Sequence, residues 1–321
     1  NLSELDVTNN PSLKKLDFGM CCHTRWGDLT PIEHIDLSRN PELEELNCAS
    51  SNYPGFGLDE LDVSNNPKLR IISANGNPKI ETLDVTNNPE LEVLNCDHNS
   101  LSALDVTKCP KLRTLHCAYN ELGQLDLTQS VALEQLDCQN NRIDKLDVSN
   151  TKIGYLMAPD NRIASVNMGD KTFDTPSPSG SGYEDAGLPY LYINLNNNQL
   201  TDIDLSKQKY LYWLEISGNR LTSLDLTGCS KVGGVLCGDN SLTSLVLDGC
   251  TRLWELRFAN NGLSGELDLS PFSLTRIASE GNRLETIYVP QDFDPDATYF
   301  MGGVGTLPCY TKDAETDWVK K

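Results

Sequence analysis

The chain has 321 residues, a mass of 35.5 kDa and a formal net charge of −20 at pH 7. This acidity argues against nucleic-acid binding, which requires a surplus of lysine and arginine, and it favours cationic partners. No run of about 18 apolar residues occurs, so the sequence predicts no membrane-spanning helix.

The first 70 residues contain an irregular repeat. The chain opens at NLSELDVTNNP, inside a repeat and without a charged-then-apolar leader, so we interpret residue 1 as a processed or trimmed end. Repeat frames begin near Leu13, Leu43 and Leu69, and insertions interrupt them near residues 19–31 and 50–58. Aromatic residues of these insertions indicate either a second contact zone or plain spacers, and they are Trp26, Tyr53 and Phe56.

From Leu91 onwards the repeat is regular. LEVLNCDHNSLSALDVTKCPK, residues 91–111, is followed at once by LRTLHCAYNELGQLDLTQSVA, residues 112–132. The alternation of apolar and polar residues predicts a short strand with Leu94 and Cys96 inward and Val93 and Asn95 outward. The turn-rich LDVT half returns the chain along the opposite side. Further frames begin at Leu112, Leu133, Ile153, Tyr190, Leu211, Val232, Leu253 and Leu274.

The repeat predicts the fold and the domain boundaries. A unit of this size cannot bury its apolar face alone, whereas units stacked about 4.8 Å apart share one continuous core. We therefore expect a single solenoid over residues 1–289, formally α/β but with little helix, and a third insertion near residues 169–189. The tail over residues 290–321 lacks the repeat and is interpreted as a C-terminal cap with Tyr299, Phe300 and Trp318 as packing anchors.

An asparagine recurs once per unit at an inward position. Its amide can satisfy backbone N–H and C=O groups that a turning chain leaves without partners inside a solenoid, so we expect a structural role. Ser51 takes this position in an early unit, beside an insertion. The column comprises Asn99, Asn120, Asn141, Asn161, Asn198, Asn219, Asn240, Asn261 and Asn282.

Cysteines fill part of another inward column. Free cysteine behaves as a small hydrophobe, and this column also holds Ala, Leu, Ile and Phe, so stacked free thiols are expected rather than a metal site. The column reads Cys48, Ala74, Cys96, Cys117, Cys138, Ala158, Leu195, Ile216, Cys237, Phe258 and Ser279. Disulfides stay open for other cysteines, namely Cys21, Cys22, Cys229, Cys250 and Cys309. Thiols in place of turn asparagines are the preferred interpretation of Cys109, Cys229 and Cys250.

An aspartate column precedes Val or Leu and then Ser or Thr. Bonding of each carboxylate to nearby backbone N–H groups is the expected role, and a calcium-binding edge is the weaker alternative. The column comprises Asp6, Asp36, Asp62, Asp84, Asp105, Asp126, Asp147, Asp204, Asp225 and Asp268.

Function is expected at outward positions of the strands, because the inward columns are committed to folding. Three consecutive units carry an aromatic residue there: Tyr155, Tyr192 and Trp213. Exposed aromatic patches indicate a partner or a sugar ring, although the insertion near residues 169–189 could instead cover these rings as a small satellite core. The candidate binding residues are Tyr155, Met157, Tyr192, Asn194, Trp213 and Glu215, with Asn196 beside them.

Catalysis finds little support in the sequence. His98 and His116 fall one repeat apart with Asp97 and Asp137 nearby, but no nucleophile, oxyanion site or enclosing pocket accompanies them. We therefore predict no catalytic residue, no metal and no cofactor.

The pattern LxxLxCxxNxLxxLDVxxNPx resembles the nested 21-residue leucine-rich repeat of internalin J-like proteins of the bacterial cell surface, including Bacteroidetes proteins. The resemblance covers roughly residues 2–289. It implies a curved right-handed solenoid with a parallel sheet on the concave face and a cysteine ladder in the core. It further implies a secreted or surface-anchored protein that contacts another macromolecule, although neither an N-terminal cap nor an anchoring signal is seen.

We therefore predict a non-catalytic, monomeric binding module, secreted or on a bacterial surface, that contacts an unidentified protein through its concave face. A glycan bound by the same aromatic residues and a purely structural surface protein are the alternatives. The identity of the partner, the mode of anchoring and whether the chain is a fragment are left open.

Overall fold

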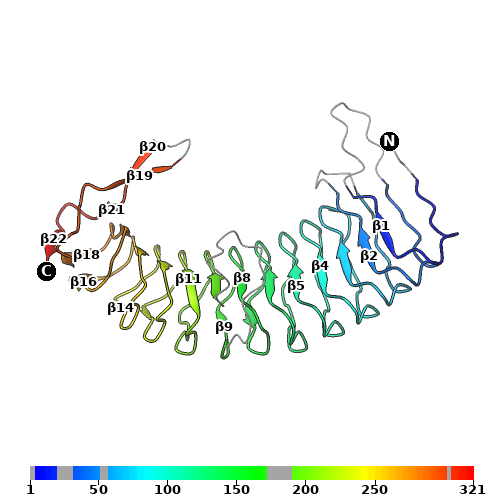
Figure 1. Cartoon of the computed structure of the whole chain (residues 1–321), viewed down its shortest axis with the longest axis horizontal. Helices are drawn as coiled ribbons and strands as arrows, with labels where there is room; N and C mark the ends of the chain where they lie inside the picture. Colours follow the sequence, from blue (N-terminus) through cyan, green and yellow to red (C-terminus); the bar gives the residue numbers. More distant parts are fainter. Residues whose placement is uncertain (1–3, 20–31, 51–56, 172–189, 302–304) are drawn as a thin grey trace. The chain divides into compact units, whose positions relative to one another are not determined.

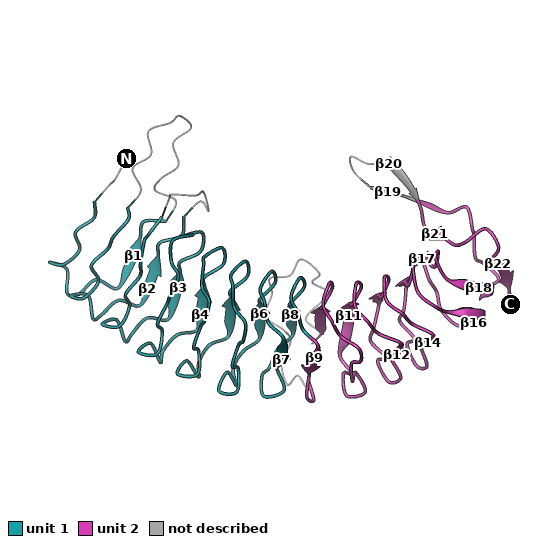
Figure 2. Ribbon diagram, turned by 180° about the vertical axis from the view of Figure 1, so that it is seen from behind, with its two compact units in different colours: residues 1–163 teal, residues 164–321 magenta. Residues whose placement is uncertain are grey.

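The computed structural model describes residues 4–19, 32–50, 57–171, 190–301 and 305–321. The chain divides into two compact units, unit 1 over residues 1–163 and unit 2 over residues 164–321 (Figure 2). Each unit is a parallel β-solenoid whose strands lie side by side in chain order (Figure 1). The described segments contain no α-helix, and hence no helix that could span a membrane.

Unit 1 is built on a ladder of three-residue strands. One parallel sheet runs in the order β1-β2-β3-β4-β5-β6-β8, with each strand one repeat beyond the last. The strands are β1 (Lys15–Asp17), β2 (Glu45–Asn47), β3 (Ile71–Ser73), β4 (Val93–Asn95), β5 (Thr114–His116), β6 (Gln135–Asp137) and β8 (Tyr155–Met157), and β7 (Lys145–Asp147) belongs to the turn-rich half.

Unit 2 has the same design, with three parallel sheets in its described residues. The first runs in the order β10-β11-β13-β15-β17-β21, and the turn-rich halves form the pair β12-β14 and the sheet β16-β18-β22. The first sheet contains β10 (Leu191–Asn194), β11 (Leu211–Glu215), β13 (Gly234–Leu236), β15 (Glu255–Arg257), β17 (Arg276–Ala278) and β21 (Tyr310–Thr311). The remaining strands are β9 (Ser165–Asn167), β12 (Ser223–Asp225), β14 (Ser244–Val246), β16 (Ser264–Asp268), β18 (Arg283–Val289), β22 (Asp317–Lys320) and the antiparallel pair β19 (Thr298–Met301) and β20 (Gly305–Pro308).

The predicted inward columns form the core. Leu94 and Cys96 are fully buried, and Val93 and Asn95 are half-buried on the outer face of the sheet. Backbone bonds from Cys96 to His116 and from Cys117 to Asp137 tie successive cysteine rungs together. The cysteine ladder is therefore confirmed, and the nine described cysteines are all free thiols, Cys229, Cys250 and Cys309 among them. Burial raises the pKa of Cys48 and Cys237 to about 12, so these thiols stay protonated and unreactive.

One repeat frame differs from its prediction. Tyr190 was expected to fill the core position of its unit, but it is only half-buried, and Leu191 packs in the core opposite Leu211. A register irregularity follows, after which Tyr192 pairs with Trp213 as the repeat predicts. The physical reason is the greater apolar burial of a leucine that can enter a closed interior without a hydroxyl to satisfy.

The asparagine column does what the sequence predicts. Asn141 donates its amide to the carbonyl oxygens of Cys117 at 2.9 Å and Cys138 at 3.1 Å, and it accepts the N–H of Leu122 at 2.9 Å. Each amide thus bridges two rungs and satisfies three backbone groups of the turn. Nearly the same pattern recurs from Asn77 to Asn282, while Ser51 lies outside the described residues.

The turn asparagines explain the second set of thiols. Asn88 donates its amide to the carbonyls of Val63 at 3.1 Å and Asn66 at 2.9 Å, while its own side-chain oxygen has no hydrogen-bond partner. This position needs a donor only, so a thiol can replace the amide. Cys109 places its sulfur 3.5 Å from the carbonyl of Val85, and Cys229 and Cys250 repeat this contact with Leu205 and Leu226.

The tail adds one strand to each of two sheets of unit 2. Strand β21 pairs with β17 and β22 pairs with β18. Asp313 accepts the N–H groups of Gly281 at 3.0 Å and Asn282 at 3.1 Å, which the next rung would otherwise bind. Trp318 packs on Phe293 with ring centroids 5.0 Å apart. These contacts support the proposal that residues 290–321 cap the solenoid.

Candidate functional site

A cluster of aromatic side chains lies on the outer sheet face of unit 2. It comprises Tyr192, Tyr212, Trp213 and Trp254, all half-buried, and we call it the aromatic patch. The ring centroids of Trp213 and Trp254 are 5.5 Å apart, and those of Tyr212 and Trp213 are 6.5 Å apart. Tyr192 and Trp213 were predicted from the sequence, but Tyr212 and Trp254 were missed. The latter two lie one position earlier in their repeats, and aromatic residues at that position would have been the signal for them.

The carboxylate of Glu215 organises the patch. Its Oε1 atom accepts hydrogen bonds from the Tyr192 hydroxyl at 2.7 Å and the Trp213 indole nitrogen at 2.9 Å. Its Oε2 atom accepts from the side-chain amides of Asn194 at 2.9 Å and Asn196 at 3.0 Å. Four donors thus converge on one carboxylate, which holds both rings in fixed orientations. Four of the predicted residues are therefore brought together: Tyr192, Asn194, Trp213 and Glu215.

Two glycines of the neighbouring rung make room for the indoles. A Cβ atom on Gly234 would lie 2.2 Å from the Trp213 ring, and one on Gly233 would lie 2.7 Å from the Trp254 indole nitrogen. Both rings therefore lie against the backbone of the segment that forms β13. Glycine in a strand costs roughly 0.5–1 kcal/mol relative to alanine, and unit 1 carries Val93 and Thr114 at the Gly234 position. The sequence thus gives up strand stability to accommodate the rings.

The other two predicted site residues belong to unit 1. Tyr155 and Met157 lie on the outer face of β8, where both are half-buried. The insertion near residues 169–189 falls largely outside the described residues, as do Trp26, Tyr53 and Phe56 of the earlier insertions.

The histidines considered for catalysis sit in a different arrangement. His98 stacks on Tyr119 with ring centroids 4.2 Å apart, and the Nδ1 atom of His116 lies 3.8 Å from a carboxylate oxygen of Asp97. Burial raises the pKa of Asp97 to about 6, against the bond that it accepts from the N–H of Ala118. Neither of the two pockets found in the described residues is lined by these histidines or by Asp97.

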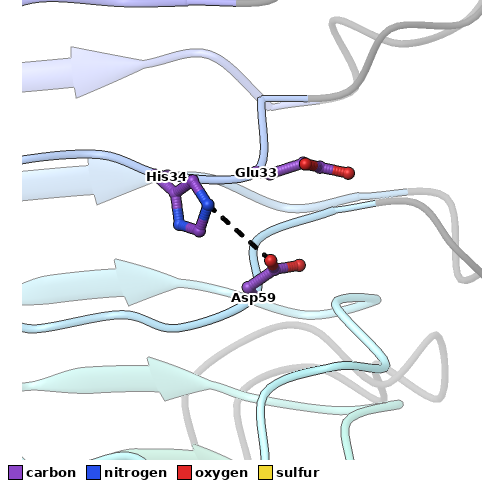
Figure 3. Close-up of side chains that lie close together, drawn as sticks. All are labelled: Glu33, His34 and Asp59. Carbon is purple, nitrogen blue, oxygen red and sulfur yellow. Dashed lines mark ion pairs between the residues drawn. The ribbon is translucent and has the colours of Figure 1, made fainter.

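Three groups with metal-ligand atoms meet in unit 1. Glu33, His34 and Asp59 place one such atom each within 4.8 Å of the others, and Figure 3 shows the imidazole turned toward Asp59. Lys79, however, lies 2.7 Å from Asp59 and 3.3 Å from Glu33. The ammonium group of Lys79 therefore offsets part of the negative charge of the two carboxylates, and the cluster forms an ion-pair network at the surface.

The aspartate column bonds locally, as predicted. Asp105 accepts the N–H of Thr107 at 2.9 Å and its hydroxyl at 2.7 Å, and these bonds lower the pKa of the carboxyl. Asp126 and Asp147 border the same shallow surface pocket of about 740 Å³, and Asp126 has the same bonds with Thr128. Carboxylates satisfied within their own turns present no calcium-binding cage.

Comparison with known proteins places the fold. No protein-family model and no curated protein matches the sequence. The functional domain of InlJ from Listeria monocytogenes, which includes a cysteine ladder, is a structural neighbour with a TM-score of 0.72 and 25% identity, covering 94% of this chain. This chain spans 66% of the length of that protein.

Two further neighbours share the fold. The internalin InlF from Listeria monocytogenes has a TM-score of 0.51 at 15% identity and covers 80% of this chain and 82% of its own. A chain of the LRIM1/APL1C complex has a TM-score of 0.57 at 17% identity and covers 89% of this chain and 59% of its own. Together with the parallel strands and the buried thiols described above, these likenesses show that the chain has the fold of a leucine-rich-repeat solenoid with a cysteine ladder in its core, similar to that of the InlJ domain.

Proposed function

We propose that the chain is a non-catalytic binding module that docks a protein partner on the outer sheet face of unit 2, at the aromatic patch. Glu215 holds the rings of Tyr192 and Trp213, and Asn194 bonds to the carboxylate of Glu215. Tyr155 and Met157 of unit 1 are proposed as further contact residues. The observation that carries the proposal is the Gly233–Gly234 pair, which accommodates two indoles that folding does not require. Rigid aromatic anchors of this kind dominate the free energy of protein–protein binding.

A protein partner is favoured over a glycan by the state of the polar groups. A sugar would need Asn194, Asn196 and Glu215 to bind its hydroxyls, but these side chains already bond to one another and to the rings. If these hydrogen bonds were broken, the half-buried carboxylate of Glu215 would lose its donors, which is energetically costly. Flat indoles and tyrosine rings, in contrast, present apolar surface that a protein side chain can cover without disturbing the network.

The resemblance to internalin-type proteins supports export and action at a bacterial surface, and we propose that the chain acts as a monomer. The thiols are compatible with that setting. Eight of the nine described cysteines are buried, and burial raises the pKa of Cys109 and Cys229 to about 11, which suppresses the thiolate that oxidation needs.

The test is site-specific photocrosslinking on intact bacterial and animal cells. Benzoylphenylalanine at position 254 should capture a protease-sensitive partner, and the same probe at the exposed Val131 of unit 1 should not. Trp213→Ala should reduce capture at least 30-fold, the loss expected of a hot-spot residue worth about 2 kcal/mol or more.

A glycan array supplies the decisive contrast. Binding to a sugar that disappears in Trp213→Ala would replace the protein partner by a glycan. Absence of both crosslinks and sugar binding would favour a structural role in a surface layer.

A further inference from the structure

A carboxylate is buried on the outer sheet face two strands beyond Trp213. Glu255 of β15 is only 2% exposed, although every other described residue of its column retains some solvent contact except Gly234. Its oxygens lie 2.6 Å from Arg257 and 3.3 Å from Arg276. A carboxylate this deeply buried is destabilising unless charged partners such as these compensate it.

Folding alone does not call for this arrangement. From Ile71 to Tyr155 the corresponding positions of unit 1 hold uncharged residues such as Val93 and Thr114, and the charged pair Lys15–Glu45 at its start is exposed to solvent. A well-packed apolar residue is often as stable as a buried ion pair. What the buried carboxylate does achieve is orientation: it fixes two guanidinium groups whose side chains remain 39% and 36% exposed. Glu255 is thus a positioning residue, and the two arginines are the groups presented to solvent.

A pocket opens beside these arginines. It measures about 280 Å³, and its walls include Arg257, Arg276, Ile277, Glu280 and Thr311. Glu280, which follows β17, accepts a hydrogen bond from the hydroxyl of Thr311 in β21. We call this cavity the arginine pocket.

The arginine pocket is adjacent to the aromatic patch by strand register. Trp213 pairs with Gly234, Gly234 with Glu255, and Glu255 with Arg276, in one row across four strands. Adjacent strands lie about 4.8 Å apart, so the pocket begins within about 10 Å of the glycine that supports the indole. A single short peptide segment can reach both.

We propose that the arginine pocket binds a carboxylate of the same partner that covers the aromatic patch, which makes this inference rest on the proposed function. Guanidinium groups match carboxylates through two parallel hydrogen bonds, and a second arginine adds charge complementarity. Because the chain has a net charge of −20, most of its surface repels an acidic group. The pocket therefore determines where along the sheet face the acidic residue of the partner binds. Glu280 opposes the bound carboxylate and tunes its affinity.

Four peptides test the pocket by NMR titration of the arginine Nε–Hε signals. Acetyl-Phe-Glu-amide offers a side-chain carboxylate, acetyl-Phe-Gln-amide is its neutral isostere, acetyl-Phe-Gln with a free terminus offers a main-chain carboxylate, and acetyl-Ala-Glu-amide lacks the ring. At least one of the two Phe peptides with a carboxylate should bind 10-fold or more tighter than the neutral isostere, and which one does so identifies the source.

Variants separate the pocket from the patch. Arg257→Gln should remove the preference for a carboxylate. Arg257→Lys should retain part of that preference, because it keeps the positive charge but loses the two parallel N–H donors of the guanidinium group. Glu280→Gln should increase the preference about 3-fold. Trp213→Ala should weaken the Phe peptides equally and leave acetyl-Ala-Glu-amide unchanged. Circular dichroism and thermal unfolding of each variant verify that it is folded.

Equal binding of the charged and neutral peptides, a preference that survives in Arg257→Gln, or no binding of any peptide would overturn the pocket assignment. The crosslinking described above is independent of these peptides. Capture of a partner at position 254 without any carboxylate preference would leave the proposed function standing and remove only the arginine pocket.

Discussion

The two units use the same repeat position for opposite purposes. In unit 1 the residue after the first leucine of the frame alternates in charge from the Leu13 frame to the Leu133 frame, and Gly154 follows in the last frame. In unit 2 the same column includes Tyr212, Gly233, Trp254 and Thr275. The charges of unit 1 pair across rungs, as Arg70 does with Glu92 at 2.9 Å. The alternating column comprises Lys14, Glu44, Arg70, Glu92, Arg113 and Glu134.

This difference shows how one repeat position can stabilise the stack of repeats in one unit and present a binding surface in the other. A stacked column forces each side chain against its counterpart one repeat away, so neighbours of opposite charge neutralise one another and leave little for a partner to bind. Unit 2 replaces those charges with rings and glycines, and the rings face outward because no counterpart fills the space. The inward columns are shared by both units, and only the outer columns distinguish them.

The largest loss of stability should come from substitutions in the asparagine column, which both units share, and it should be equal in the two units. Asn141→Ala in unit 1 and Asn219→Ala in unit 2 should each lower the free energy of unfolding by about 3–4 kcal/mol, because each leaves two buried carbonyls and one N–H without partners. Urea denaturation followed by circular dichroism measures this. Asn88→Cys is the control and should cost less than about 1 kcal/mol, since thiols already serve that column. Unequal losses in the two units would break the idea of a common frame.

The next effect is specific to unit 2. Gly234→Ala should cost about 1–3 kcal/mol and shift the Trp213 emission, because the new methyl group would lie 2.2 Å from the indole. In a Trp213→Ala background the same substitution should be harmless or stabilising, and this double-mutant cycle isolates the contact. Thr114→Val at the matching position of unit 1 should change stability by less than about 0.5 kcal/mol. An additive cycle would contradict the role assigned to the glycine.

A third prediction concerns the acidity of unit 1. Burial raises the pKa of Asp97 from 3.8 to about 6, so the folded state holds this proton more tightly than the unfolded state does. The stabilisation is complete below pH 3.8 and is lost as the pH rises through about 6.

Asp97→Asn removes the charge and keeps an acceptor for the N–H of Ala118. Relative to the wild type, the variant should therefore gain about 1–2 kcal/mol of stability between pH 4 and pH 8, a value reduced from the full shift because the side chain is 19% exposed. Unfolding curves at several pH values measure this gain. A difference between the two proteins that does not vary with pH would argue against the raised pKa.

The smallest effect belongs to the charge column. Glu92→Lys places three positive charges in succession with Arg70 and Arg113, and it should cost up to about 1 kcal/mol at low ionic strength and little in about 1 M NaCl. Thr275→Lys puts the same charge at the matching position of unit 2 and serves as the comparison, with a weaker salt dependence expected. Equal salt dependence at both positions would mean that the alternation in unit 1 has no electrostatic consequence.

Much of the fold could be predicted because its information is periodic. The inward leucines, the cysteine ladder and the asparagine column each repeat in a single environment, so one unit explains the others. Tyr190 shows where this logic fails: the spacing is right, but the preference of the closed core for Leu191 moves the frame by one residue. Tyr192 and Trp213 of the aromatic patch were predicted because they share one outward column. Tyr212 and Trp254 belong to the preceding column, for which no binding role was predicted.

What the sequence by itself determined is the stack of rungs, since every rung must bury the same columns against the next. Only the tertiary structure decided which outward residues act together. The four donors that converge on Glu215, the glycines beneath the indoles and the buried carboxylate of Glu255 depend on side chains one or two repeats away. Whether these side chains meet depends on the size and charge of the residues in the neighbouring repeat, including small residues such as glycine. The periodic pattern of the sequence does not specify those residues.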